Sequence, residues 1–204
     1  MLGYIIAISI ILLIVIILVL VNWPQRKERG FTPEKLAGIV GEVIAGNYIK
    51  EILRKGDHLF RNVPIEYNGE KTELDYMILN KNGVFIIEVK NLSGKLYGRE
   101  DDLTWEKHKT TESGNVYEKT IDNPIRQVKR EERIFGQYLR SEGIRVWVEG
   151  YVFFVENNSS VKSPYILRTN QDISRVIHRE TNTVLKEEVM QKILQKYQKI
   201  EVRS

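Results

Sequence analysis

The chain has 204 residues, of which 42% are hydrophobic and 28% charged, and 31 Lys and Arg against 27 Asp and Glu give a net charge of +4. This balance excludes an intrinsically disordered chain and predicts one domain of ordinary size with a short appendage. Cysteine is absent, which excludes disulfides, thiol nucleophiles and Cys-ligated zinc or iron–sulfur centres. The mildly basic balance permits a polyanionic partner without requiring one.

The first segment, residues 2–21, carries no charge, and 16 of its 20 residues are Leu, Ile or Val. A helix of this length spans about 30 Å, which is the thickness of the hydrocarbon core of a bilayer. A cleaved signal peptide would show a basic start, a shorter apolar run and a small-residue cleavage site, and this segment has none of them. The sequence therefore predicts an uncleaved transmembrane helix over residues 1–22.

The residues flanking this segment predict its orientation. One aromatic and three basic residues follow it: Trp23, Arg26, Lys27 and Arg29. Tryptophan anchors at the membrane interface, and basic residues are retained in the cytoplasm. We therefore expect a single-pass membrane protein of a bacterial cell, with its N-terminus outside, a linker over residues 23–31 and a cytoplasmic domain over residues 32–204. Binding of the basic cluster to anionic lipid head groups is a second interpretation.

The cytoplasmic part begins with a predicted helix. Thr32-Pro33-Glu34 is a typical helix start, and apolar residues recur at helical spacing until Gly56. Gly38 and Gly41 lie inside this helix, where glycine costs about 1 kcal/mol relative to alanine. They indicate either close approach of another element or a weak helix.

A β-rich stretch follows. Residues 59–67 and 71–80 flank Asn68-Gly69, the strongest short signal for a hairpin, and Asn82-Gly83 turns the chain into the apolar strand 84–90. Turn residues then separate three shorter predicted strands, at residues 95–97, 103–107 and 116–119.

The remaining elements complete an α/β pattern. Asp122-Asn123-Pro124 starts a second helix, and the continuous apolar run 146–155 predicts a strand buried on both faces. A short strand at residues 165–168 and helices near residues 172–179 and 184–197 follow. This order predicts one α/β domain with a mixed central sheet flanked by helices.

Three residues carry the predicted chemistry. Glu88 and Lys90 lie on one face of the strand 84–90 because side chains alternate along a strand, and Asp75 lies on the preceding strand of the hairpin. Two carboxylates and an ammonium would then converge at the end of a buried sheet, which is costly without a partner. A divalent cation resolves that cost, and oxygen ligands suit Mg²⁺ or Mn²⁺.

The triplet Glu-x-Lys alone has little weight, since about one is expected by chance in a chain of this length. Polar residues at the end of a surface strand are also ordinary. The context distinguishes this triplet, because four apolar residues lead directly into Glu88 and an acid lies on the neighbouring strand.

Asp75 with Glu88-Val89-Lys90 resembles the PD-(D/E)xK nuclease pattern. More closely, the chain resembles the nuclease-related domain (NERD) family in an ordered set of pieces within about residues 38–130. These are Gly38-Ile39-Val40-Gly41-Glu42, Glu73-Leu74-Asp75, the run from Gly83 to Asn91 with Ser93-Gly94, and Asn123-Pro124 with Gln127. Leu74 stands where the generic pattern has Pro.

The resemblance implies a restriction-endonuclease-like core with a helix, three antiparallel strands, a second helix and a further strand. It also implies metal binding by Asp75 and Glu88, a catalytic role for Lys90, and further catalytic roles for Glu42 and Gln127. The expected function is a membrane-anchored, Mg²⁺- or Mn²⁺-dependent nuclease acting on nucleic acid, with DNA as the expected substrate. The alternative is a non-catalytic domain that binds nucleic acid or protein at the membrane.

Overall fold

The computed structural model describes residues 32–110, 114–156, 158–181 and 184–198. The predicted transmembrane segment, residues 2–21, lies outside these ranges. Among the described helices, none combines the length and the apolarity that a membrane span requires. The second of the two compact units in the chain, Pro33–Ser204, contains all of the helices and strands described below.

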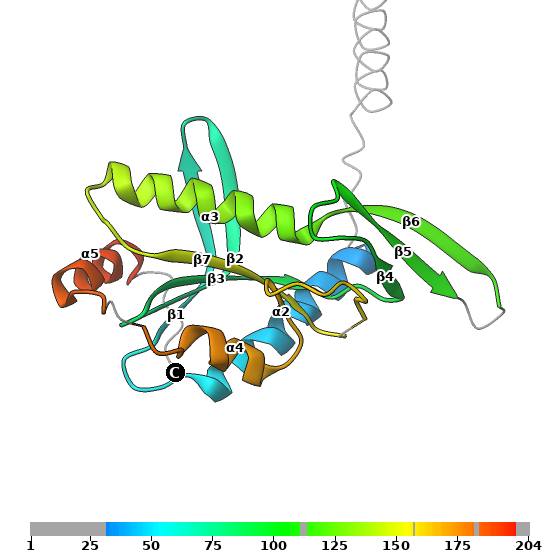
Figure 1. Cartoon of the computed structure of the whole chain (residues 1–204), viewed down its shortest axis with the longest axis horizontal. Helices are drawn as coiled ribbons and strands as arrows, with labels where there is room; N and C mark the ends of the chain where they lie inside the picture. The colour runs from blue at the N-terminus through cyan, green and yellow to red at the C-terminus, as the bar shows by residue number, and fades with distance from the viewer. Residues whose placement is uncertain (1–31, 111–113, 157, 182–183, 199–204) are drawn as a thin grey trace, which may run out of the picture. The chain divides into compact units, whose positions relative to one another are not determined.

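A mixed five-stranded sheet forms the centre of this unit (Figure 1). Its strands lie in the order β1 (His58–Tyr67), β2 (Glu70–Asn80), β3 (Gly83–Lys90), β7 (Val148–Phe154) and β8 (Ile166–Leu167). β1, β2 and β3 are antiparallel neighbours, whereas β7 is parallel to β3 and β8 is parallel to β7. The predicted mixed α/β fold is confirmed.

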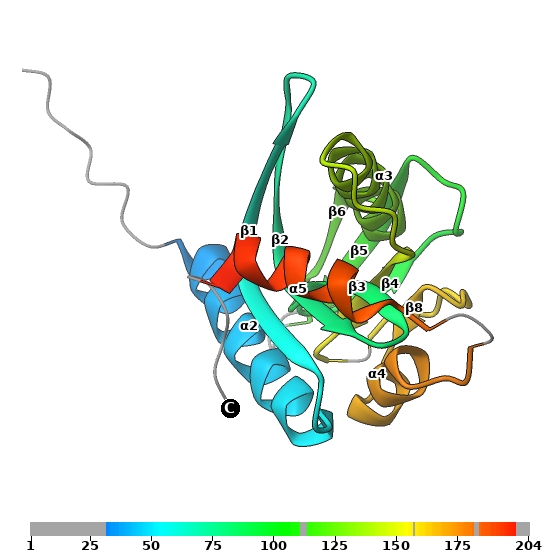
Figure 2. The same ribbon diagram turned by 90° about the vertical axis from the view of Figure 1, so that its left-hand side faces the viewer.

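Helices cover both faces of the sheet (Figures 1 and 2). α3 (Pro124–Ser141) covers one face, where its apolar side packs with α5 (Glu187–Tyr197) in one hydrophobic cluster. α2 (Pro33–Ile52) and α4 (Asn170–Ile177) cover the other face in a second cluster. β3 supplies alternate residues to the two clusters, which is the alternation expected for a strand buried on both faces.

The three short strands predicted after β3 form a separate antiparallel sheet. It consists of β4 (Lys95–Tyr97), β5 (Thr104–Thr110) and β6 (Val116–Asp122). Trp105 of β5 is 1% exposed and stacks on Phe154 of β7, with the ring centroids 6.2 Å apart. This aromatic contact packs the small sheet against the core of the unit.

α2 buries its small residues and exposes its large ones. Gly41, Ala45, Gly46 and Ile49 are buried, whereas Leu36, Ile39, Val40 and Val43 are 36–54% exposed. A Cβ atom at Gly41 would lie 2.3 Å from the Cβ of Asn91, and one at Gly46 would lie 2.4 Å from the hydroxyl of Tyr76. Close approach of another element therefore explains Gly41, but not Gly38, whose Cβ would meet nothing within 4 Å.

This difference predicts opposite effects of the same substitution at two helical positions. Gly41→Ala should lower the free energy of unfolding by about 1–3 kcal/mol, because Asn91 or the helix must move to admit the methyl group. Gly38→Ala is the matched control and should raise it by about 0.5–1 kcal/mol through helix propensity. Urea unfolding of residues 32–204 measures both changes, and equal effects of the two substitutions would contradict the packing described here.

Candidate active site

The antiparallel pairing of β2 with β3 brings Asp75 beside Glu88. The last registered pair is Tyr76 with Ile87, so the next position places Asp75 opposite Glu88. The Asp75 carboxylate accepts a hydrogen bond from the backbone N–H of Val89, with Oδ2 2.8 Å from the nitrogen. The convergence of the two acids that the hairpin pattern predicted is therefore present in the structure.

The pairing of β1 with β2 is interrupted beside Asp75. β1 and β2 pair up to Arg61 with Tyr76 and resume at Val63 with Leu74, so the pair between them is missing. Asn62, the β1 residue at this gap, has a φ of 52°, a left-handed conformation that Asn tolerates better than most residues. Asp75 thus lies at a break in the ladder, where its side chain accepts from β3. The sequence analysis did not foresee this break.

Glu88, Lys90 and Gln127 form one hydrogen-bonded cluster on the α3 side of the sheet. Lys90 Nζ lies 2.6 Å from Glu88 Oε1 and 2.9 Å from Gln127 Oε1. The Gln127 amide nitrogen donates to the same Glu88 Oε1 at 2.7 Å. The Glu88 side chain is 4% exposed and that of Lys90 is 23% exposed. The carboxylate is therefore enclosed, while the ammonium is accessible from outside.

A third carboxyl group, that of Glu131, extends the cluster along α3. Glu131 is 1% exposed, and its Oε1 accepts from Gln127 Nε2 at 3.1 Å and from Thr72 Oγ1 at 3.4 Å. Glu131 was not among the predicted site residues. It lies four residues after Gln127, on the helix face that carries Val128 and Phe135, and this spacing could have indicated a role beside Gln127.

Burial and mutual repulsion raise the pKa values of two of these acids, Asp75 and Glu131. Burial, followed by the negative charge of Glu88, raises the pKa of Asp75 to about 7. The same two causes raise the pKa of Glu131 to about 8. The buried oxygens Glu88 Oε2 and Glu131 Oε2 have no hydrogen-bond partner. The site therefore contains more buried negative charge than Lys90 alone can compensate.

Glu42 lies at the margin of this cluster rather than in its hydrogen-bonded centre. Its carboxylate pairs with Arg61 at 2.9 Å, and its backbone carbonyl accepts from the Tyr76 hydroxyl at 2.8 Å. The hydrogen bond to Glu42 raises the pKa of Arg61, and the charge of Glu42 contributes to the raised pKa of Asp75. Glu73, two residues before Asp75, is exposed on the hairpin. The structure thus groups Asp75, Glu88, Lys90 and Gln127, with Glu42 nearby.

The carboxylate pair fits a divalent cation. Glu88 Oε2 is a buried acceptor without a partner, and the raised pKa of Asp75 reflects burial followed by repulsion from Glu88, both of which a cation would offset. No cluster of three or more His, Cys, Asp or Glu suited to a metal ion occurs among the described residues. Mg²⁺ does not require such a cluster, because it is commonly held by one or two carboxylates together with waters and substrate phosphates.

A surface cleft of about 760 Å³ adjoins the cluster along α3. Gln127 and Glu131 line it together with Thr72 and four basic residues of the helix: Arg126, Lys129, Arg130 and Arg133. Lys129 pairs with Glu100, whereas Arg130 and Arg133 both pair with Glu70. Arg126 is exposed and has no ionic partner among the described residues. The cleft therefore offers cationic groups that a polyanion can contact, several of them already held in place by acids.

The fold and the site together define an α/β protein with two acids and a lysine at the end of a buried strand, beside a basic cleft. The model of the nuclease-related domain (NERD) family matches residues 37–155. The chain belongs to this family. An uncharacterized protein of Bacillus anthracis is 29% identical over 97 residues, which are 47% of this chain and 45% of that protein. The chain thus spans about half the length of this curated relative. No solved structure matches.

The raised pKa of Glu131 predicts a pH-dependent cost to stability in the absence of divalent cations. Its value of about 8 lies above the ordinary 4.5, so the folded state favours the protonated acid and loses stability as the pH rises from about 5 through 8. Glu131→Gln keeps the shape and removes this titration. The variant should match the wild type at pH 5 and be about 2 kcal/mol more stable at pH 8.5.

Urea unfolding in EDTA at the two pH values measures this difference. Glu73→Gln, which alters an exposed carboxylate outside the cluster, is the control and should show no such pH-dependent gain. A Glu131→Gln variant with the same stability difference from wild type at both pH values would contradict the assignment.

Proposed function

We propose that this NERD protein is a Mg²⁺- or Mn²⁺-dependent nuclease of the PD-(D/E)xK type, with a restriction-endonuclease-like core. The observation that carries the proposal is the hydrogen bonding of the Lys90 ammonium. The ammonium has three N–H donors, of which Glu88 and Gln127 occupy two. The third N–H is available to a phosphate oxygen or an attacking water, and the partly exposed side chain allows either to approach.

Asp75 and Glu88 are the residues that would hold the metal ion. When bound, Mg²⁺ would offset charge on the phosphate and favour ionisation of water. The protein's own groups then orient the reactants. Gln127 holds Lys90 and Glu88 in a fixed relation through its two amide atoms. Glu131 and Thr72 in turn fix the Gln127 amide, and Glu42 balances Arg61 beside Asp75.

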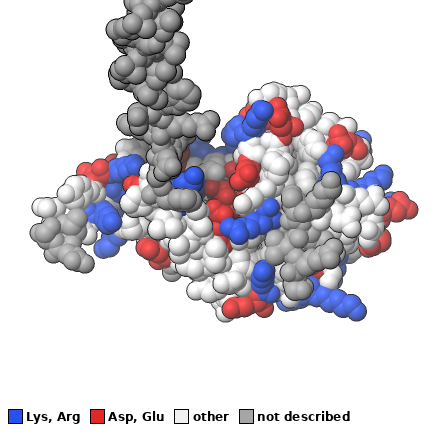
Figure 3. All heavy atoms as spheres, turned by 180° about the vertical axis from the view of Figure 1, so that it is seen from behind, with Lys and Arg blue, Asp and Glu red and all other residues white. Residues whose placement is uncertain are grey.

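Nucleic acid, with DNA preferred, is the proposed substrate, and the basic cleft along α3 is the proposed route to the site. On the face in Figure 3, basic and acidic side chains are interspersed over the described surface. A net charge of +4 therefore gives limited long-range attraction. Local contacts from residues such as Arg126 would supply the phosphate binding, and this binding should weaken with salt.

Lys90→Ala should lower the rate of metal-dependent cleavage by about 100-fold or more, since it removes the cation that bonds to the buried Glu88 carboxylate and a donor to the phosphate. Lys81→Ala is the matched control, because Lys81 is exposed in the turn before the same strand. Cleavage of single-stranded, duplex and branched DNA and of RNA, with Mg²⁺ or Mn²⁺, is the measurement.

Metal binding separates this proposal from the non-catalytic alternative. Calorimetric titration with Mn²⁺ should detect a site in wild type that Glu88→Ala abolishes. If wild type and Lys90→Ala are equally inactive on every substrate, and nucleic-acid binding is independent of metal and of Asp75→Ala, the protein is a binding domain and the enzymatic proposal is wrong.

We further propose that residues 1–22 anchor the protein in the membrane, with the domain in the cytoplasm. The uncharged apolar run and the three basic residues that follow it support this topology. A reporter fused after Ser204 should be active only in a cytoplasmic assay, and the mature protein should retain residues 1–21. A reporter active only outside, or a mature N-terminus after Val21, would contradict this topology. The first of these results would also separate the domain from its proposed substrate.

A further inference from the structure

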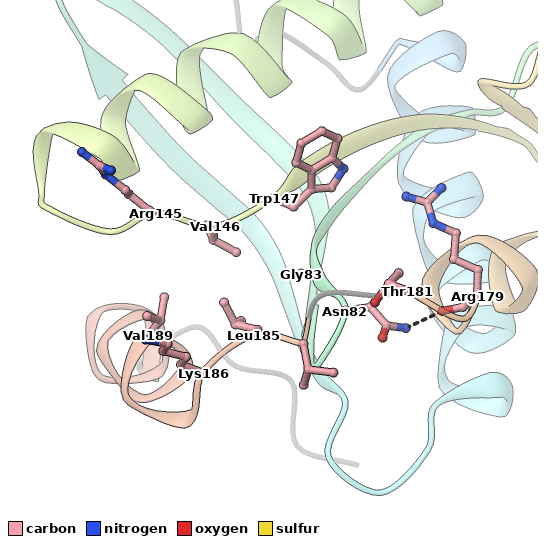
Figure 4. Close-up of a pocket in the computed structure, with 11 residues that line it drawn as sticks. Asn82, Gly83, Arg145, Val146, Trp147, Arg179, Thr181, Leu185, Lys186 and Val189 are labelled. Atoms are coloured by element: carbon pink, nitrogen blue, oxygen red, sulfur yellow. Dashed lines mark hydrogen bonds between the residues drawn. The ribbon is translucent and has the colours of Figure 1, made fainter.

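A second cavity lies at the opposite end of β3 from the site (Figure 4). Its volume is about 680 Å³, and Asn82 and Gly83, at the start of β3, form part of its lining. Glu88 lies five residues further along the same strand, or about 17 Å away. The remaining lining comes from residues 145–147, from Arg179 and Thr181 after α4, and from the segment 184–189 leading into α5.

The lining combines apolar walls with positive charge. Five lining residues are large and apolar: Val146, Trp147, Val184, Leu185 and Val189. Three are cationic, Arg145, Arg179 and Lys186, and none of the described lining residues is acidic. The volume is in the range of small-molecule sites. The cavity is therefore suited to an anion that also has an apolar part.

Trp147 presents a fixed aromatic surface at this cavity. It is 69% exposed, although tryptophan is usually well buried. Its indole N–H donates to Glu149 Oε1, which also pairs with Arg179. The other Glu149 oxygen accepts from the Tyr151 hydroxyl at 2.5 Å. Glu149 thus holds the edge of the indole and the guanidinium of Arg179 in place, and Figure 4 shows Arg145 and Arg179 flanking Trp147 in this view.

Backbone contacts of Gly83 and Val84 also fix the main chain of Trp147 at this cavity. Gly83 has a φ of 138°, and a Cβ atom there would lie 2.7 Å from the carbonyl oxygen of Trp147. The backbone N–H of Val84 donates to that same oxygen at 2.9 Å. The position of Trp147 is therefore set by its main chain as well as by Glu149, so the aromatic surface is preorganised for a ligand.

We propose that this cavity binds a nucleotide, with the base against the indole of Trp147 and the phosphate on Arg145 and Lys186. Arg179 lies on the other side of Trp147 in the view of Figure 4 and is already paired with Glu149. Bases stack on exposed aromatic side chains, and arginine and lysine bind phosphate. The choice of a nucleotide over another aromatic anion rests on the proposed nuclease function. A free nucleotide and a nucleotide within a single strand share this chemistry.

Trp147 itself provides the readout. The full chain, kept in zwitterionic nanodiscs because of its apolar N-terminal segment, is titrated in EDTA with dAMP and with a single-stranded hexadeoxyadenylate. Subtracting the signal of Trp147→Phe removes the contributions of Trp23 and Trp105. Both ligands should quench the difference fluorescence of Trp147 in a saturable manner. Ribose 5-phosphate has the phosphate but no base, and it should bind at least 10-fold more weakly than dAMP.

Arg145→Ala should weaken nucleotide binding about 10-fold, and circular dichroism will verify its fold. Arg140→Ala is the matched control, an exposed arginine five residues earlier that does not line the cavity. Equal affinity for dAMP and the hexanucleotide would identify a site for a free nucleotide, and a 10-fold higher affinity for the hexanucleotide would identify a subsite for a strand.

Absence of quenching by both ligands, equal binding of ribose 5-phosphate and dAMP, or an unchanged affinity in Arg145→Ala would overturn the proposal. The test is independent of cleavage, because Glu88→Ala and Lys90→Ala lie at the other end of β3 and should leave the quenching unchanged. A protein that binds nucleotide here but cuts no substrate would disprove the nuclease proposal alone. A protein that cuts but shows no quenching would disprove this site alone.

Discussion

The buried carboxylate of Glu88 is the constraint on which the rest of the site depends. It lies near the end of β3, and the strand residues before it are buried on both faces, so water cannot solvate its charge. Lys90 and Gln127 both bond to Oε1, and the other oxygen is left without a partner. Burial, and then the repulsion from this carboxylate, raises the pKa of Asp75 and of Glu131. A structure selected for stability alone would have an apolar residue at this position. Replacing a buried charge cluster with well-packed hydrophobic residues of similar volume often stabilises a protein.

The packing of α2 follows from the same site. The helix turns Gly41 toward Asn91, which follows Lys90 at the end of β3, and Gly46 toward Tyr76, which follows Asp75 on β2. Asn91 donates to the carbonyl of Ala37, and Tyr76 donates to that of Glu42. Larger side chains on this face would hold the helix away and break both bonds. The consequence is that Leu36, Val40 and Val43 face outward, so the hydrophobic effect alone does not explain the orientation of this helix.

Much of this arrangement was predictable because it depends on local rules. Asn68 and Gly69 both adopt positive φ, 49° and 78°, as a tight hairpin turn requires. The turn at Lys81 and Asn82 fixes the pairing of β2 with β3 in the same way. Alternation then places Asp75 and Glu88 together and Lys90 on the face of Glu88. The boundaries of β3 and the start of α3 at Pro124 follow equally local signals, and Asn123 caps α3 by accepting from the N–H of Ile125.

The unpredicted parts depend on contacts between segments distant in sequence. The break at Asn62 has no distinctive motif, since an Asn within a strand pattern does not by itself indicate a positive φ. Glu131 is one of several charged residues on α3, and its spacing from Gln127 is a weak signal until the packing of the helix against the sheet separates it from exposed Arg130 and Arg133. The separation of β4, β5 and β6 into their own sheet also depends on packing, because their strand signals resemble those of the central sheet.

The mixed topology of the sheet explains how residues of β2, β3 and α3 reach one point. Antiparallel pairing sets the early part of β2, with Asp75, against the end of β3. Parallel pairing of β3 with β7 requires a crossover, and α3 lies within that connection. Gln127 and Glu131 lie in the first half of this helix, which therefore brings its amide and carboxyl groups to the carboxyl end of β3. A purely antiparallel sheet would supply the two acids without the helix, and a purely parallel sheet could not join β2 to β3 by the tight turn that sets Asp75 opposite Glu88. This site requires both kinds of pairing on the two sides of β3.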